Sequence, residues 1–281
     1  MGRKTRRVRQ RVEKMPFAAR PFEGLPDECE WVALRNFVER GRATVTLRDG
    51  RQISIVSQLP GGAVACVKED GEIQVAIQVM HDFGDLSRDL AHAIDLIADG
   101  EPGTSVSMTD PGVGERLQDI VDPDSRFEVE ILESFDFWKP KDPDAEEDMA
   151  LDQTILEAKT LSHPSWRIRP HAYITQYTSF ESYLRWFLLE DERAVLTALA
   201  RLHLASTDRV GGRHLLGTFQ ADGLPVLVWE VSRFDDHEKL AKHVANVEEA
   251  LTEALARDDE PLTQAERSAR QSLMSRQVVV R

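Results

Sequence analysis

The sequence contains the same local pattern twice, and this repetition constrains the fold more than any other feature. In the later copy, residues 217–255, the pair Asp222-Gly223 separates residues 219–220 from the apolar run 226–231. Asp-Gly between two such segments favours a tight β-hairpin, because these residues tolerate the positive φ of the turn. Asp235 and Asp236 then suit a helix N-terminus. One face of that helix is marked by Leu240, Val244, Val247 and Leu251.

The earlier copy has the same order of elements. Asp70-Gly71 precedes the alternating apolar residues of 73–79, and Asp85 precedes a second helical pattern. The apolar face of that helix consists of Leu86, Leu90, Ile94 and Ile97. We therefore expect an α+β fold with two antiparallel β-sheet modules, each with helices covering one face. We interpret the modules as candidate tandem related repeats.

The flanking segments set the predicted boundaries. Residues 1–19 lack a sustained apolar period and are expected to be a disordered basic arm. The first module then spans residues 20–138, and the second spans 153–281. Between them, residues 139–152 are rich in Pro, Asp and Glu and are expected to form a solvated acidic linker. Thr263 and Glu266 have the spacing of a capping box, which predicts a C-terminal helix.

Charge is divided unevenly along the chain. Residues 1–14 carry a formal charge of +6. Because the net charge of the whole chain is −14, the remaining residues carry −20. The basic side chains are Arg3, Lys4, Arg6, Arg7, Arg9, Arg11 and Lys14. Such an arm can neutralise phosphates, so RNA, DNA or the ribosome are its expected partners. A solubilising tail without a dedicated ligand is the alternative.

Cysteine content and apolar run length indicate the compartment. Cys29 and Cys66 are the only cysteines, and neither belongs to a C-x-x-C pair. Two thiols cannot complete a four-ligand zinc site, and reduced thiols are typical of the cytoplasm. Apolar runs stay well below the roughly 18 residues of a membrane span. We expect a cytoplasmic protein that does not contact a membrane.

The aromatic cluster at residues 135–138 and two of the histidines could each have a structural or a functional role. Three aromatics fall within residues 135–138, and we expect them to close one edge of the core, with a stacking platform as the alternative. His92 and His203 lie inside helical apolar patterns. Hydrogen-bonded core histidines explain them better than catalytic bases.

An enzymatic alternative rests on acidic helix starts. If the modules are related by a pseudo-twofold axis, Asp82, Asp85, Asp235 and Asp236 could meet and hold Mg²⁺, as in a metal-dependent hydrolase or nuclease. Helix capping also accounts for these acids. No phosphate-binding loop or nucleophile elbow is present in the sequence, and we expect no cofactor.

Several segments together carry a family resemblance. They are residues 20–26 (Arg-Pro-Phe-Glu-Gly-Leu-Pro), 31–35, 101–104, 135–138 (Phe-Asp-Phe-Trp), 198–203 and 260–277. With the basic start, these segments resemble an uncharacterised actinobacterial domain-of-unknown-function family. Members of that family sometimes carry the labels SecA or topoisomerase, which this sequence does not support, because it has no Walker loop and no zinc-binding cysteine cluster. The resemblance implies no catalytic residues.

These observations favour a non-enzymatic cytoplasmic binding or adaptor protein. Its acidic body is expected to contact a protein partner, and its basic arm to contact nucleic acid or the ribosome. The metal-dependent hydrolase and a homo-oligomeric scaffold that pairs through sheet edges are the alternatives.

The arm hypothesis predicts a salt-sensitive gel shift. The full chain should retard RNA or DNA, more weakly at the higher of two salt concentrations, because phosphate neutralisation releases counterions. A chain lacking residues 1–14 should not retard it. Equal retardation by both chains would contradict a role for the arm.

Overall fold

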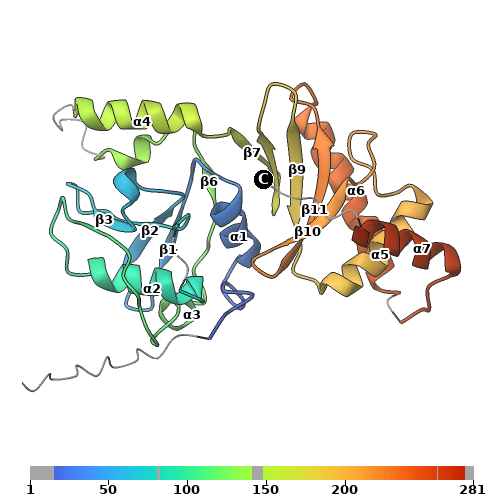
Figure 1. Cartoon of the computed structure of the whole chain (residues 1–281), viewed down its shortest axis with the longest axis horizontal. Coiled ribbons are helices and arrows are strands. Elements are labelled where there is room, and N and C mark those ends of the chain that lie inside the picture. Colours follow the sequence, from blue (N-terminus) through green and yellow to red (C-terminus); the bar gives the residue numbers. More distant parts are fainter. Residues whose placement is uncertain (1–15, 81–82, 141–147, 258, 276–281) are drawn as a thin grey trace, which may run out of the picture.

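Two β-sheets stand next to each other, with helices between them and around them (Figure 1). The computed structural model describes residues 16–80, 83–140, 148–257 and 259–275. The α+β class expected from the sequence is confirmed. Among the described helices, none has the length and apolar character needed to cross a bilayer.

The first module is built on a six-stranded sheet in the order β5-β3-β4-β2-β1-β6. Its strands are β1 (Gly41–Thr46), β2 (Gln52–Val56), β3 (Ala65–Val67), β4 (Ile73–Ala76), β5 (Ser105–Val106) and β6 (Glu130–Ile131). Its helices are α1 (Glu28–Asn36), α2 (Leu86–Ile97) and α3 (Leu117–Ile120), with 3-10 turns η1 (Pro60–Gly62) and η2 (Asp136–Trp138). All pairs are antiparallel except β2 and β4, which run parallel. The sheet of the first module, expected to be antiparallel, therefore contains one parallel pair.

The second module has a five-stranded antiparallel sheet in the order β10-β11-β9-β8-β7. The strands are β7 (Ser165–Arg169), β8 (Ala172–Gln176), β9 (Ser182–Phe187), β10 (Gly217–Ala221) and β11 (Leu224–Val231). Its helices are α5 (Glu192–Ala205), α6 (His237–Leu255) and α7 (Gln264–Ser275), and α4 (Met149–Leu161) precedes its first strand in the chain.

Both repeated units form as predicted from their local chemistry. Gly71 and Gly223 adopt φ of +81° and +84° in their hairpin turns, which an Asp-Gly pair permits. Asp85 and Asp236 cap α2 and α6 by accepting backbone N–H groups. The sheets around these units differ in strand order and direction, so a repeat relationship between whole modules stays a prediction.

The second sheet is buried on both faces, which corrects the expectation of helices on one face only. Side chains of Tyr173, Phe187 and Val226 belong to a first core that they share with the first module. The neighbouring Ile174, Trp186 and Leu227 point the other way, into a second core under α5, α6 and α7. The first core thus runs without interruption from the first sheet to the second, and the two modules form one body.

Helix α1 occupies the junction between the two sheets (Figure 1). Trp31 of α1 is fully buried and stacks on Phe127 at 3.7 Å and on Phe22 at 5.6 Å between ring centroids. Its indole N–H donates to the Pro26 carbonyl, so the one polar atom of the ring is satisfied. The aromatic stack anchors α1 to the chain on both sides of it.

A buried carboxylate links α1 to the second sheet. Glu30 is 2% exposed, and its Oε1 accepts from the His171 backbone N–H at 3.1 Å and from Arg167 Nη2 at 3.3 Å. The Tyr173 hydroxyl donates to the other oxygen. Burial, and then the Glu30 charge, raise the pKa of Tyr173, which keeps this donor protonated. The charge is thus held by one cation and two further donors.

Helix α4 corrects two predicted boundaries. It begins at Met149, inside the expected 139–152 linker, and Asp148 caps it; residues 141–147 lie outside the described part. Its Ile155 is buried in the first core, so α4 packs on the first module, although the sequence assigned it to the second. At the N-terminus, residues 16–19 were expected to belong to the disordered arm, yet the Ala18 N–H donates to the Gly84 carbonyl at 2.8 Å.

Removal of the Glu30 carboxylate should destabilise the whole molecule. We expect Glu30→Ala to lower the free energy of unfolding by about 3 kcal/mol, because the buried Tyr173 phenol and the partly buried Arg167 guanidinium lose their acceptor. Glu130→Ala is the matched control: Glu130 pairs with Arg42 at the surface, and its loss should cost less than about 1 kcal/mol. Urea unfolding of both variants measures the difference, and equal losses would contradict the role given to Glu30.

Candidate functional site

Of the acids proposed for a metal-dependent enzyme, the three that the structure describes form no cluster of metal-ligand spacing. Asp85 caps α2 in the first module and pairs with Arg116 at 2.5 Å. Asp235 and Asp236 lie before α6 in the second module. Asp235 accepts from Arg213 and from the Ser232 N–H, and Asp236 caps α6. These three carboxylates thus serve helix caps and ion pairs, and Asp82 lies outside the described residues.

Two other predicted features are placed as follows. The basic side chains of the arm, Arg3, Lys4, Arg6, Arg7, Arg9, Arg11 and Lys14, lie outside the described residues. The aromatics of η2 are buried in the first core, with Phe135, Phe137 and Trp138 packed on one another. They close the core edge as expected, and their burial removes them as a stacking platform.

A groove of about 600 Å³ lies where the edge strands of the two sheets approach each other. Val129 and residues 131–133, around β6, form one wall, and residues 164–167, at the start of β7, form the other. Arg40, Lys159 of α4 and His237 of α6 complete the lining. Each of β6 and β7 is paired along one side only within the described sheets, so each presents an open backbone edge.

The groove is basic although the protein as a whole is acidic. Arg40, Lys159 and Arg167 line it, against the single carboxylate of Glu133. Arg40 is buried, its Nη1 donates to the Glu133 carbonyl at 2.7 Å, and its Nε–H has no hydrogen-bond acceptor among the described residues. Trp166, 38% exposed, stands edge-on to His237 at 5.5 Å. The groove combines an aromatic surface, cationic side chains and an unused buried donor.

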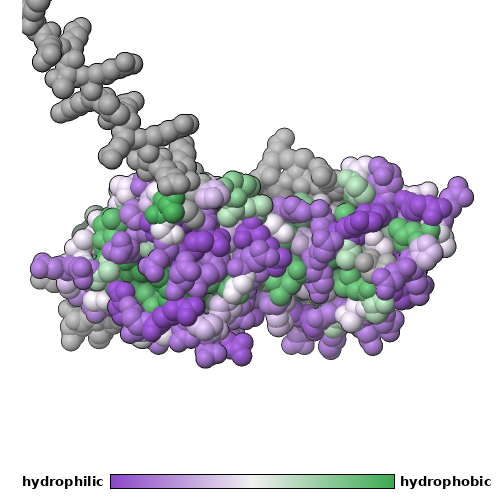
Figure 2. All heavy atoms as spheres, turned by 90° about the horizontal axis from the view of Figure 1, so that it is seen from below, coloured by the Kyte–Doolittle hydropathy of each residue, from purple (hydrophilic) through white to green (hydrophobic). Residues whose placement is uncertain are grey.

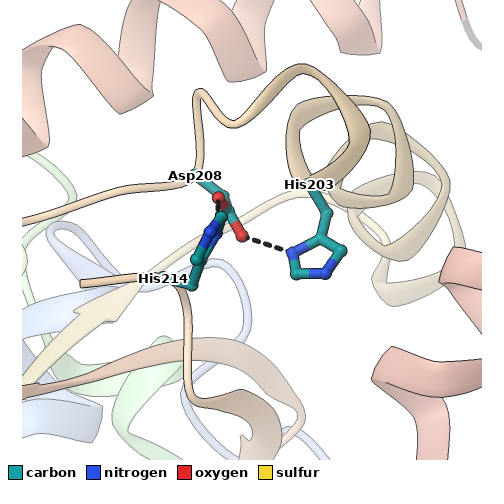
Figure 3. Close-up of side chains that lie close together, drawn as sticks. All are labelled: His203, Asp208 and His214. Atoms are coloured by element: carbon teal, nitrogen blue, oxygen red, sulfur yellow. Dashed lines mark hydrogen bonds and ion pairs between the residues drawn. The ribbon is translucent and has the colours of Figure 1, made fainter. Parts of the chain in front are cut away.

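A second cluster lies at the far side of the second sheet, where His203, Asp208 and His214 converge (Figure 3). His203 Nδ1 and His214 Nδ1 each lie 2.7 Å from a different oxygen of Asp208. Asp208 is fully buried, whereas both histidines reach the surface. One metal-binding atom from each residue lies within 4.8 Å of the other two. Among the described residues, this is the one group of three such side chains with their ligand atoms this close together.

Local backbone geometry assembles this cluster. Helix α5, whose last turn carries His203, ends at Ala205. The next residue, Ser206, adopts φ of +58° and reverses the direction of the chain. Gly211 and Gly212, at φ of +59° and +76°, then form a two-residue turn closed by hydrogen bonds between Val210 and Arg213. This turn brings His214 back beside Asp208.

Sequence reasoning missed two members of the cluster. His203 was expected to be a hydrogen-bonded core histidine; it is hydrogen-bonded, but it reaches the surface and is not part of the core. Asp208 and His214 were not singled out. The available signal in the sequence is the pair Gly211-Gly212, because two successive glycines favour a tight turn. A two-residue glycine turn also predicts that Arg209 faces His214 across the hairpin, and their side chains meet at 2.6 Å.

Comparison with known proteins places the chain in a family. A model of the Family of unknown function (DUF5926) matches residues 21–281. The chain belongs to this family. No curated protein and no solved structure matches it. The DUF5926 match confirms the expected membership of a domain-of-unknown-function family and includes both modules, the groove and the histidine cluster. An actinobacterial origin stays a prediction.

Both thiols of this DUF5926 chain have raised pKa values. Burial raises the pKa of Cys29 to about 12 and that of Cys66 to about 11, and carboxylates near Cys29 add to its rise. A raised thiol pKa means that little thiolate is present near neutral pH.

We therefore expect slow alkylation of the folded protein. At pH 7 iodoacetamide should modify Cys29 and Cys66 at least about a hundredfold more slowly than in denaturant, because the thiolate fraction is lower by that order. Mass spectrometry over time measures both rates. Rapid labelling of either thiol in the folded chain would show that it is accessible as a thiolate.

Proposed function

We propose that this protein is a non-enzymatic cytoplasmic adaptor that binds an extended, acidic peptide segment of a protein partner in the groove between β6 and β7. The observation that carries the proposal is the pair of open strand edges that flank a basic groove. An extended peptide adds to such an edge through main-chain hydrogen bonds, while side-chain pockets give specificity.

The backbone of β7 supports addition of a strand. Trp166 pairs with Ile174, and Arg167 pairs with Tyr173, in an antiparallel ladder on the inner side. In such a ladder, alternate residues direct N–H and C=O groups outward, and on an edge strand these groups have no ladder partner. A peptide in the groove would satisfy them and leave its side chains to alternate between the groove and solvent.

Local charge selects the chemistry of the peptide. Lys159 is exposed at one side of the groove, and Arg40 keeps an unused N–H at another. Arg167 already pairs with Glu30 and Glu128. Its charge therefore links the second sheet to the first module and is not counted as a ligand contact. Lys159 would therefore contact a carboxylate of the peptide, the buried Arg40 would add its positive charge beneath the groove, and Trp166 would supply an apolar anchor.

On the face of the molecule drawn in Figure 2, polar residues predominate and apolar residues appear in separate patches, so that face offers no broad apolar interface.

Two further partner hypotheses accompany this proposal. The basic arm would contact RNA, DNA or the ribosome, as its charge suggests. A homo-oligomeric scaffold that pairs through the edges of β5, β6, β7 or β10 is the competing function. The molar mass in solution separates that scaffold from the adaptor.

The peptide site predicts a charge-dependent interaction. The full chain should select peptides rich in Asp and Glu from a displayed library of random linear peptides. Fluorescence polarisation with one selected peptide should then show binding weakened at least about fivefold by Lys159→Glu, which is equivalent to about 1 kcal/mol. The reason is that the exchange places a like charge beside the peptide carboxylates.

Lys242→Glu is the matched control, because Lys242 is equally exposed but lies on α6 outside the groove lining. It should change the affinity by less than about twofold. Selection of no acidic peptide, or equal weakening by both exchanges, would refute the groove as the binding site.

A further inference from the structure

We infer that His203, Asp208 and His214 form a binding site for a divalent transition-metal ion of the Zn²⁺ class. The inference rests on this side-chain cluster and is independent of the peptide groove. Two imidazoles and one carboxylate are a ligand set that suits such ions, and their donor atoms lie within 4.8 Å of one another.

The site is built rather than incidental. Asp208 is completely buried, and its backbone carbonyl accepts from the Trp229 indole N–H at 2.8 Å, which fixes its position under the second core. His203 stands on the last turn of α5, and His214 follows the glycine turn. The ligands come from a helix and a closed hairpin, so little backbone ordering remains to be done when an ion binds.

The hydrogen bonds of the cluster define what ion binding must change. Both imidazoles donate Nδ1–H to Asp208, because a buried carboxylate accepts and cannot donate. An ion between the three residues needs a lone pair at each Nδ1, so each Nδ1 proton must move to Nε2 through solvent. Asp208 exchanges two imidazole hydrogen bonds for a bond to the ion, and no net proton is released from neutral imidazoles.

Arg209 opposes this rearrangement. Its Nη2 donates to His214 Nε2 at 2.6 Å, and since a guanidinium has no acceptor, Nε2 must carry the lone pair there. Arg209 therefore holds the His214 proton on Nδ1, where the ion would bind. Arg209 is exposed and can rotate away. Arg209 therefore competes with the metal ion for His214. Removal of Arg209 should strengthen metal binding, whereas removal of either histidine should weaken it.

Three bonds from the chain leave a position for water on a tetrahedral ion. Since His203 and His214 both reach the surface, that position would face solvent. Bound metal would tie the end of α5 to the hairpin before β10.

The experiment uses the full chain without a histidine tag, freed of metal with a chelator and titrated with Zn²⁺ by calorimetry. We expect one Zn²⁺ per chain, with affinity reduced at least about tenfold in His203→Ala and in His214→Ala. His92→Ala is the control: His92 is a surface residue of the first module that bonds Thr109, and its loss should leave Zn²⁺ affinity unchanged. Arg209→Ala should bind Zn²⁺ more tightly than the natural chain.

Thermal unfolding provides a second readout. Zn²⁺ should raise the melting temperature of the natural chain and of Arg209→Ala by mass action, and should raise that of His214→Ala less at the same Zn²⁺ concentration. His214 is partly exposed, so its removal should not prevent folding. Absence of saturable Zn²⁺ binding, equal affinity in the natural chain and His214→Ala, or weaker binding by Arg209→Ala would overturn the inference.

Discussion

A sheet that is apolar on both faces needs cover on both sides, and the second sheet of this protein is such a sheet. Helices α5, α6 and α7 cover one face. The other face is covered by α1 and the first module, because Tyr173, Phe187 and Val226 contribute to the core of that module. Burial of this second face removes apolar surface from water, which stabilises the junction. The two modules consequently share one core.

The junction also buries a charged side chain, Glu30 of α1. The cost of burying Glu30 is offset by the Arg167 guanidinium, the Tyr173 hydroxyl and a backbone N–H. The same strand that supplies Arg167 forms one wall of the basic groove. The groove therefore depends on the α1 contact, because both use the position of β7 relative to the first sheet.

Local features of the fold could be predicted from the sequence, because their causes lie within a few residues. The Asp-Gly turns at Gly71 and Gly223 and the caps at Asp85 and Asp236 follow from backbone chemistry that neighbouring residues determine. The short strands β5, β6 and β7 were less predictable, since partners distant in sequence define their ends. The attachment of α4 also depends on a distant surface: Ile155 finds its contacts in the first core.

The candidate sites show the same division. The acidic residues that the sequence suggested as metal ligands include Asp85 and Asp236, which cap helices. A helix cap needs only the backbone N–H groups of the following turn. The groove arises from the approach of two sheets, which no local pattern encodes. The cluster of Asp208 with two histidines lies between these cases: its turn is local, but the burial of Asp208 under Trp229 of β11 is not.

The shared core has a consequence for synthesis of the chain. A ribosome releases the first module before β8, β9 and β11 exist, so the face of α1 that meets Tyr173 and Phe187 emerges without its cover. Completion of the nascent fold must then wait for the C-terminal half, and the exposed aromatic surface is open to chaperones during that interval.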